Sequence, residues 1–148
     1  MASRERDMRA TVVRMLKPFH AISVENAVGA PGTPDVNCSL GWIELKSVDK
    51  PKRDETRVRV DHWTKAQKIW LMKRWSVGGA ASLLVKVSDY WLLFDPPTAF
   101  EVVGKLPFIE LVDHSYNWWL RTPDKESFRQ SLINICLRKT SHKANAST

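Results

Sequence analysis

The stretch that decides the fold runs from residue 31 to residue 48 and reads Pro-Gly-Thr-Pro-Asp-Val-Asn-Cys-Ser-Leu-Gly-Trp-Ile-Glu-Leu-Lys-Ser-Val. Residues 35–40 and 42–48 form two extended runs separated by a short break at a glycine, which predicts two strands. Side chains in a strand alternate between its faces, so Glu44 and Lys46 share one face of the second strand. The apolar side chains of that strand point mostly to the opposite face, toward a core.

These two strands predict a small cluster of charged groups if they pair as neighbours. Asp35 then lies beside Glu44, and Lys46 lies at the edge of the same volume. Two carboxylates this close repel each other unless a cation sits between them, and Mg²⁺ prefers oxygen ligands such as these and the nearby carbonyl of Leu45. A metal held in this way polarises a phosphoryl oxygen, and an ammonium group stabilises the developing charge. These are the parts needed to hydrolyse a phosphodiester bond.

The spacing of these residues resembles that of a known nuclease superfamily. Pro34-Asp35 followed by Glu44-x-Lys46 is the pattern of the PD-(D/E)XK nucleases. A fuller match, over about residues 5–95, resembles the VRR-NUC branch, which is close to the small Holliday-junction resolvases of archaea and phages. The features that carry it, in order along the chain, are Gly32-Thr33-Pro34-Asp35, Ile43-Glu44-Leu45-Lys46-Ser47, Gln67 and Gly78-Gly79.

The resemblance implies a restriction-endonuclease-like core and a Mg²⁺-dependent DNA endonuclease in which Mn²⁺ can replace Mg²⁺. It implies that Asp35 and Glu44, with the backbone carbonyl of Leu45, bind the metal. Lys46 and Gln67 complete the catalytic set. Branched DNA such as a four-way junction is the implied substrate, in DNA recombination and repair. A homodimer would present two sites to the two symmetry-related strands of such a junction.

Other interpretations stay open at this stage. Glu44 and Lys46 also suit a solvated ion pair on two ordinary strands. A nuclease of this kind can act on flaps, mismatches or linear duplex instead of junctions. A non-catalytic nucleic-acid-binding module with a nuclease-like fold is a further alternative, although a binder has no need of two carboxylates facing phosphates.

The charge of the chain suits a polyanionic partner. Its 148 residues carry a formal net charge of +7, and the sequence pI is about 9.6. Residues 46–74 contain ten Lys and Arg but four Asp and Glu, so the excess of positive charge lies beside the predicted site. As a group, the residues expected to contact nucleic-acid phosphates are Lys50, Lys52, Arg53, Arg57, Arg59, Lys65 and Lys68. Each of them equally suits a solvated surface position.

The remaining composition indicates a cytoplasmic protein. Nucleases of the kind that the chain resembles often come from phages. No apolar run approaches the length of a membrane span, so no membrane partner is expected. Cys38 and Cys136 are far apart in sequence and are expected to be reduced and structural.

The hydrophobic pattern predicts one α/β domain over residues 1–139, with a central mixed sheet of about four or five strands flanked by helices. We expect helices over residues 4–17, from Asp61 or Thr64 to about 75, and over 122–139, and strands over 19–27, 35–40, 42–48, 80–87 and 90–94. Ser3 is the expected N-cap of the first helix. Glu5, in its first turn, is a candidate third metal ligand by the resemblance, or else complements the helix dipole.

Two segments are less defined. Residues 100–103 and 108–112 fit either short strands or turns of helix. The aromatic cluster at Tyr116, Trp118 and Trp119 suits a core or a dimer interface better than stacking on an unpaired base. Residues 140–148 are expected to form a disordered basic tail.

Overall fold

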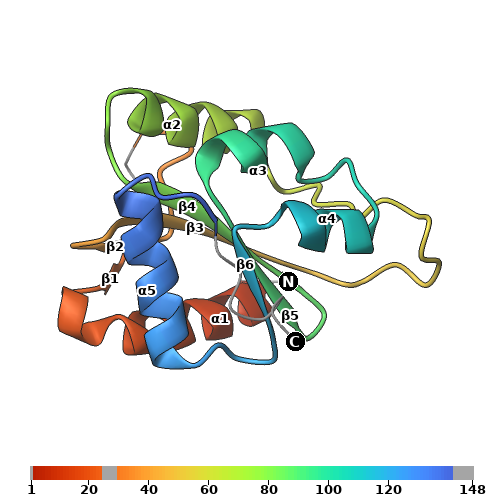
Figure 1. Cartoon of the computed structure of the whole chain (residues 1–148), viewed down its shortest axis with the longest axis horizontal. Coiled ribbons are helices and arrows are strands. Elements are labelled where there is room, and N and C mark those ends of the chain that lie inside the picture. Colours follow the sequence, from red (N-terminus) through yellow and green to blue (C-terminus); the bar gives the residue numbers. More distant parts are fainter. Residues whose placement is uncertain (1, 25–29, 142–148) are drawn as a thin grey trace.

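A mixed six-stranded sheet runs through the part of the chain that the computed structural model describes, residues 2–24 and 30–141 (Figure 1). Its strands lie side by side in sequence order: β1 (Ile22–Ser23), β2 (Val36–Cys38), β3 (Gly41–Val48), β4 (Ala81–Val87), β5 (Tyr90–Phe94) and β6 (Asn117–Leu120). All neighbours pair antiparallel except β3 and β4, which are parallel because α2 (Lys65–Ser76) crosses between them. The predicted mixed α/β sheet is confirmed.

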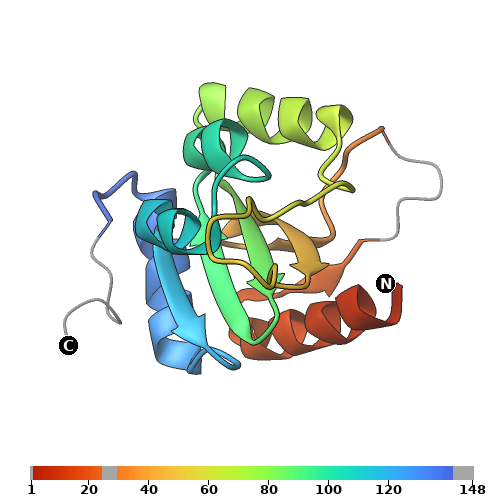
Figure 2. The ribbon, with the colours of Figure 1, turned by 90° about the vertical axis from the view of Figure 1, so that its right-hand side faces the viewer.

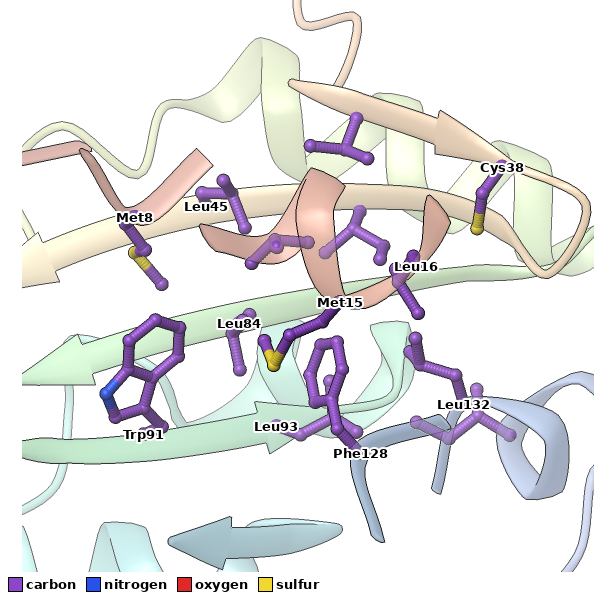
Figure 3. Packing of buried hydrophobic residues seen from close by; sticks show 14 of the residues in the cluster. Met8, Met15, Leu16, Cys38, Leu45, Leu84, Trp91, Leu93, Phe128 and Leu132 are labelled. Carbon is purple, nitrogen blue, oxygen red and sulfur yellow. The ribbon is translucent and has the colours of Figure 1, made fainter. Parts of the chain in front are cut away.

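Helices cover both faces of this sheet (Figure 2). One face carries α1 (Ala2–Met15) and α5 (Lys125–Cys136), and the other carries α2, α3 (Pro96–Val102) and α4 (Phe108–His114). The first layer buries Met8 and Met15 of α1 with Phe128 and Leu132 of α5 against the sheet (Figure 3). A hydrogen bond also joins the two helices of this layer: Arg129 Nε of α5 donates to the carbonyl of Met15 of α1 over 2.8 Å. No helix within the described ranges is long and apolar enough to cross a bilayer.

The sheet has more strands than the four or five expected, and the extra strand is β6. It lies in the aromatic segment, where Trp119 is buried and packs edge-on against Phe128. The core role predicted for this cluster is therefore confirmed for Trp119. The two ambiguous segments are helical, as α3 and α4. Asp95 starts α3 by accepting a hydrogen bond from the backbone N–H of Thr98, at 2.9 Å.

Several predicted boundaries were wrong. The strand expected over 19–27 is reduced to β1 because residues 17–19 form a 3₁₀ turn that ends at His20 in the left-handed region, with φ of 57°. Residues 25–27 of that strand, and 142–148 of the expected tail, lie outside the described part of the chain. Ser3 lies inside α1 and not at its N-cap. The connection from β3 to α2 forms an isolated antiparallel bridge, from Arg57 to Pro107.

Cys38 and Cys136 are free thiols. Burial raises the pKa of both. Cys136 donates a hydrogen bond from Sγ to the carbonyl of Leu40 over 2.9 Å. Both thiols are therefore free, and their raised pKa values favour the protonated form.

Candidate active site

Strand register brings the two predicted carboxylates together. Val36 of β2 pairs with Ile43 of β3, so the next position outward places Asp35 opposite Glu44. The hairpin turns tightly before Gly41, whose φ is 108° and where an added Cβ would lie 2.4 Å from the carbonyl oxygen of Ala80. The prediction that the two strands pair as neighbours is confirmed.

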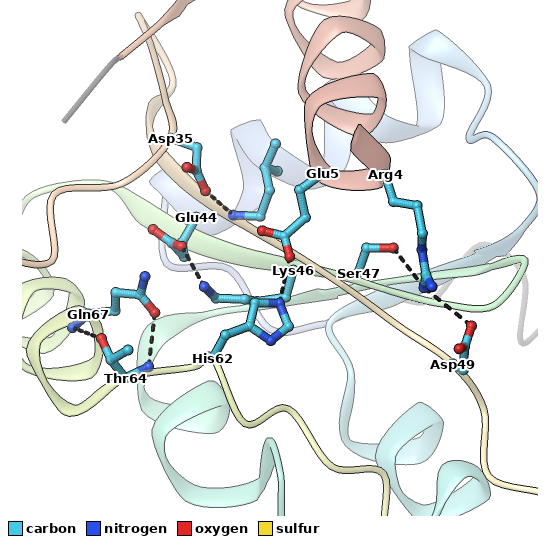
Figure 4. Close-up of polar contacts among 11 residues, drawn as sticks. Arg4, Glu5, Asp35, Glu44, Lys46, Ser47, Asp49, His62, Thr64 and Gln67 are labelled. Carbon is cyan, nitrogen blue, oxygen red and sulfur yellow. Dashed lines mark hydrogen bonds and ion pairs between the residues drawn. The ribbon is translucent and has the colours of Figure 1, made fainter. Parts of the chain in front are cut away.

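Asp35 is fixed by the backbone of the opposite strand. Its Oδ2 accepts a hydrogen bond from the backbone N–H of Leu45 at 2.9 Å (Figure 4). The N–H and C=O of one strand residue point to the same edge, because paired residues exchange both bonds. The Leu45 carbonyl therefore points toward the same edge of β3 as Asp35. This is the position expected of a carbonyl that binds a metal together with Asp35.

Glu44 and Lys46 form a buried ion pair, and this differs from the solvated pair considered above. Their exposed fractions are 2% and 3%, and Lys46 Nζ lies 3.1 Å from Glu44 Oε2. The second carboxylate oxygen, Oε1, has no hydrogen-bond partner in the described part of the chain. A buried carboxylate oxygen without a partner is costly, so this atom marks a position where a ligand would be favourable.

The protonation of Glu44 reflects the same crowding. Burial, then the negative charge of Asp35, raises the pKa of Glu44 from 4.5 to about 8, and the Lys46 ammonium opposes the rise. A rise of this kind means that the Lys46 ammonium compensates the charge of Glu44 only in part. A divalent cation between Asp35 and Glu44 would supply that compensation.

The donor set fits Mg²⁺ or Mn²⁺. It consists of the carboxylates of Asp35 and Glu44, including the unpartnered Oε1, and the Leu45 carbonyl, and hard divalent ions favour oxygen donors of these kinds. No three His, Cys, Asp or Glu side chains gather closely enough to hold a metal by themselves, within residues 2–24 and 30–141. The remaining ligands would therefore come from water and substrate, which is usual for Mg²⁺.

A cavity of about 190 Å³ opens beside Asp35 and Leu45. Glu5, Arg6 and Arg9 of α1 form its other wall. Glu5, the candidate third ligand, thus reaches the site, but its Oε2 contacts His62 Nε2 at 2.5 Å (Figure 4).

His62, Arg6 and Arg9 were not predicted as site residues. A signal for Arg9 was present, because a residue four positions after Glu5 lies on the same face of a helix. His62 carried no such signal, since 57 positions separate it from Glu5.

Gln67 lies beside this site at the start of α2. Its Oε1 accepts from the backbone N–H of Thr64 at 2.9 Å, and Thr64 Oγ1 accepts from the N–H of Gln67 at 3.2 Å. This capping box fixes the first turn of the helix, so Thr64 and not Asp61 is the cap. Gly32 packs on the same turn: its φ is 84°, and a Cβ there would lie 2.4 Å from the carbonyl oxygen of Ala66.

The predicted phosphate contacts lie in the connection from β3 to α2 and in the first turns of α2. They are the exposed residues Lys50, Lys52, Arg53, Arg57, Arg59 and Lys65, and the half-buried Lys68. Arg57 and Lys68 line one cavity of about 340 Å³. Arg57 Nη1 donates to the Gly104 carbonyl at 2.6 Å, and Arg59 pairs with Asp61 at 3.3 Å.

Comparisons with known proteins give one distant likeness. No family model and no curated protein matches the chain. A 1.6 Å structure of Hjc, a Holliday junction resolvase from the archaeal hyperthermophile Archaeoglobus fulgidus, is similar at 23% identity, with a TM-score of 0.43. The similarity covers 63% of this chain and 77% of the resolvase. A likeness this distant carries no conclusion about activity.

Proposed function

We propose that this protein is a metal-dependent DNA endonuclease that hydrolyses phosphodiester bonds. The observation that carries the proposal is the convergence of Asp35 and Glu44, with one buried carboxylate oxygen lacking a partner and an ammonium 3.1 Å from the other. A structural ion pair needs one carboxylate for one ammonium. Asp35 is not needed for the pair between Glu44 and Lys46, and its negative charge raises the pKa of Glu44.

In this proposal Asp35, Glu44 and the Leu45 carbonyl would hold Mg²⁺, which when bound would supply a Lewis acid for a phosphoryl oxygen and lower the pKa of a bound water. Lys46 keeps its ammonium beside Glu44, where it orients the water and stabilises the negative charge of the pentavalent phosphate. Gln67, through its capping box, holds the first turn of α2 in place.

The proposed substrate is branched DNA such as a four-way junction, cut by a homodimer. The motif resemblance and the net charge of +7 support it. A two-fold dimer would place two copies of the Asp35–Glu44 pair on the two symmetry-related strands.

The test is cleavage of an immobile four-way junction with Mg²⁺, Mn²⁺ and Ca²⁺ in parallel, beside flap, single-stranded and linear DNA built from the same strands. We expect cleavage with Mg²⁺ and Mn²⁺, strongest on the junction, and loss of cleavage in Asp35→Asn, Glu44→Gln and Lys46→Met. Light scattering during size-exclusion chromatography tests the dimer. Cleavage that survives all three substitutions would contradict the assigned site. DNA binding without cleavage under any metal would instead favour a non-catalytic binding module.

A further inference from the structure

A second, larger hollow lies along the outer side of α1. Its volume is about 600 Å³, and it separates the helix from the chain around β1. The residues that form most of its wall are Arg6, Arg9, Val13, Arg14, Lys17 and Ala21. We call this hollow the α1 groove.

Helical spacing explains why these side chains share one face. Arg6, Arg9 and Val13 are separated by three and four positions, which places them in one row along α1. Met8 and Val12 lie about 110° around the helix from this row and are buried against the sheet. In Figure 2, α1 lies along one side of the sheet; the row of Arg6, Arg9 and Val13 lines the groove, and Val13 also packs against the core.

The groove is strongly cationic. Arg6, Arg9, Arg14 and Lys17 all line it, no acidic residue in the described part of the chain does, and none of these four makes a salt bridge there. Arg6, Arg14 and Lys17 are exposed, so their charges are available to a partner. Like charges gathered on one wall repel, and an anion along that wall lowers their energy.

The groove adjoins the candidate active site. Arg6 and Arg9 line both the α1 groove and the 190 Å³ cavity that contains Asp35. From Arg6 to Arg14 the helix rises by about 12 Å, which matches three to four base-pair steps of duplex DNA at roughly 3.4 Å each, and Lys17 follows in the 3₁₀ turn. The wall therefore runs as one cationic track that leads to the carboxylates.

We infer that the α1 groove binds the phosphate backbone of the DNA strand that continues from the cleaved phosphate. This inference rests on the proposed function, since it takes Asp35 and Glu44 as the place of cleavage. Its partner is a polyanion of regularly spaced phosphates, because the cations follow one another along the helix. The predicted phosphate contacts lie in the connection from β3 to α2 and in the first turns of α2, and none of them lines the groove, so the groove adds a second contact surface.

The test is the salt dependence of DNA binding by the double variant Arg14→Gln/Lys17→Gln. Both residues lie in the α1 groove, and neither lines the cavity with Asp35. Fluorescence anisotropy with a four-way junction in EDTA, from 50 to 200 mM salt, measures binding without cleavage. Loss of two phosphate contacts lowers the slope of log K against log salt by about 2, so the fall in affinity over this range shrinks about tenfold.

The matched control is Lys125→Gln/Lys139→Gln, which removes the same charge from exposed positions outside the groove. We expect its slope to stay within about 0.5 of the wild-type slope. Equal slopes for the groove variant and the control would overturn the inference. So would binding of the wild-type groove to phosphatidylserine vesicles in preference to DNA.

Metal-dependent cleavage by the wild-type chain is scored separately in the same preparations. Absence of cleavage together with a groove-dependent slope would refute the nuclease and leave a DNA-binding groove. Cleavage together with unchanged slopes would refute the groove alone.

Discussion

Replacing Glu44 by glutamine removes a buried carboxyl group whose pKa is raised to about 8 in the folded protein. In the unfolded chain this group titrates near 4.5. Between these two values the unfolded state releases the proton and the folded state keeps it. The stability contributed by the protonated group is therefore fully present below pH 4.5 and is lost as the pH rises to about 8.

The size of this effect follows from the two pKa values. Each pKa unit corresponds to about 1.4 kcal/mol, so the rise from 4.5 to about 8 amounts to about 5 kcal/mol above pH 8. At pH 5 most of that loss has not yet occurred. We therefore expect the free energy of unfolding of the wild type to fall by about 3–4 kcal/mol between pH 5 and pH 9, relative to Glu44→Gln.

The assay is urea unfolding in EDTA at pH 5, 7 and 9, followed by tryptophan fluorescence. Glu101→Gln, which changes an exposed glutamate in the same chemical way, is the control and should show no such pH dependence. Addition of Mg²⁺ at pH 8 should stabilise the wild type and leave Glu44→Gln unchanged, since a ligand stabilises only the state that binds it. A constant difference between wild type and Glu44→Gln from pH 5 to pH 9 would refute the account of a crowded, uncompensated carboxylate.

Substitutions at Asp35, Lys46 and Gly32 test the surroundings of Glu44, and Gly78→Ala serves as the comparison for Gly32→Ala. Asp35→Asn keeps an acceptor for the Leu45 N–H, so we expect a folded protein whose Mg²⁺ affinity, measured by calorimetry, falls more than about 100-fold, since even outer-shell partners are worth 10–100-fold. Lys46→Met leaves Glu44 buried without its cation and should cost about 3 kcal/mol or more in urea unfolding at pH 9, and less at pH 5. Gly32→Ala should cost about 3 kcal/mol, because a Cβ there meets the Ala66 carbonyl, while Gly78→Ala, with a similar φ and open space, should cost about 1 kcal/mol. Equal costs for the two glycine variants would show that the close approach at residue 32 does not matter.

The site could be predicted to the extent that it depends on local pairing. Asp35 and Glu44 meet through a short hairpin, and the period of two together with Gly41 was enough to anticipate that contact. The burial of Lys46 was not anticipated, because it depends on the helices that close over the sheet. A pattern of alternating residues shows which side chains share a face, but not how deeply that face is covered.

The missed features depend on partners far away in the sequence. Strand β6 contains the buried Asn117, whose side chain donates to Ser131 Oγ at 3.1 Å. Without its partner on α5, a buried asparagine between aromatic residues gives no strand signal. The role of His62 could not be predicted for the same reason, since its contact with Glu5 joins segments 57 positions apart. Local pattern fixed the hairpin, whereas the walls around it are products of tertiary packing.

Helix α5 supports α1. Its Arg129 donates a hydrogen bond to the Met15 carbonyl, and its Phe128 and Leu132 pack in the same core as the buried side chains of α1. This support has a consequence during synthesis. The ribosome releases the first helix long before the last one, and domains acquire their packing only when the required segments have emerged. Until α5 leaves the exit tunnel, α1 lacks part of its support, and so does the wall that carries Glu5, Arg6 and Arg9. A nascent chain that still lacks α5 would thus lack part of the packing that holds this wall beside Asp35.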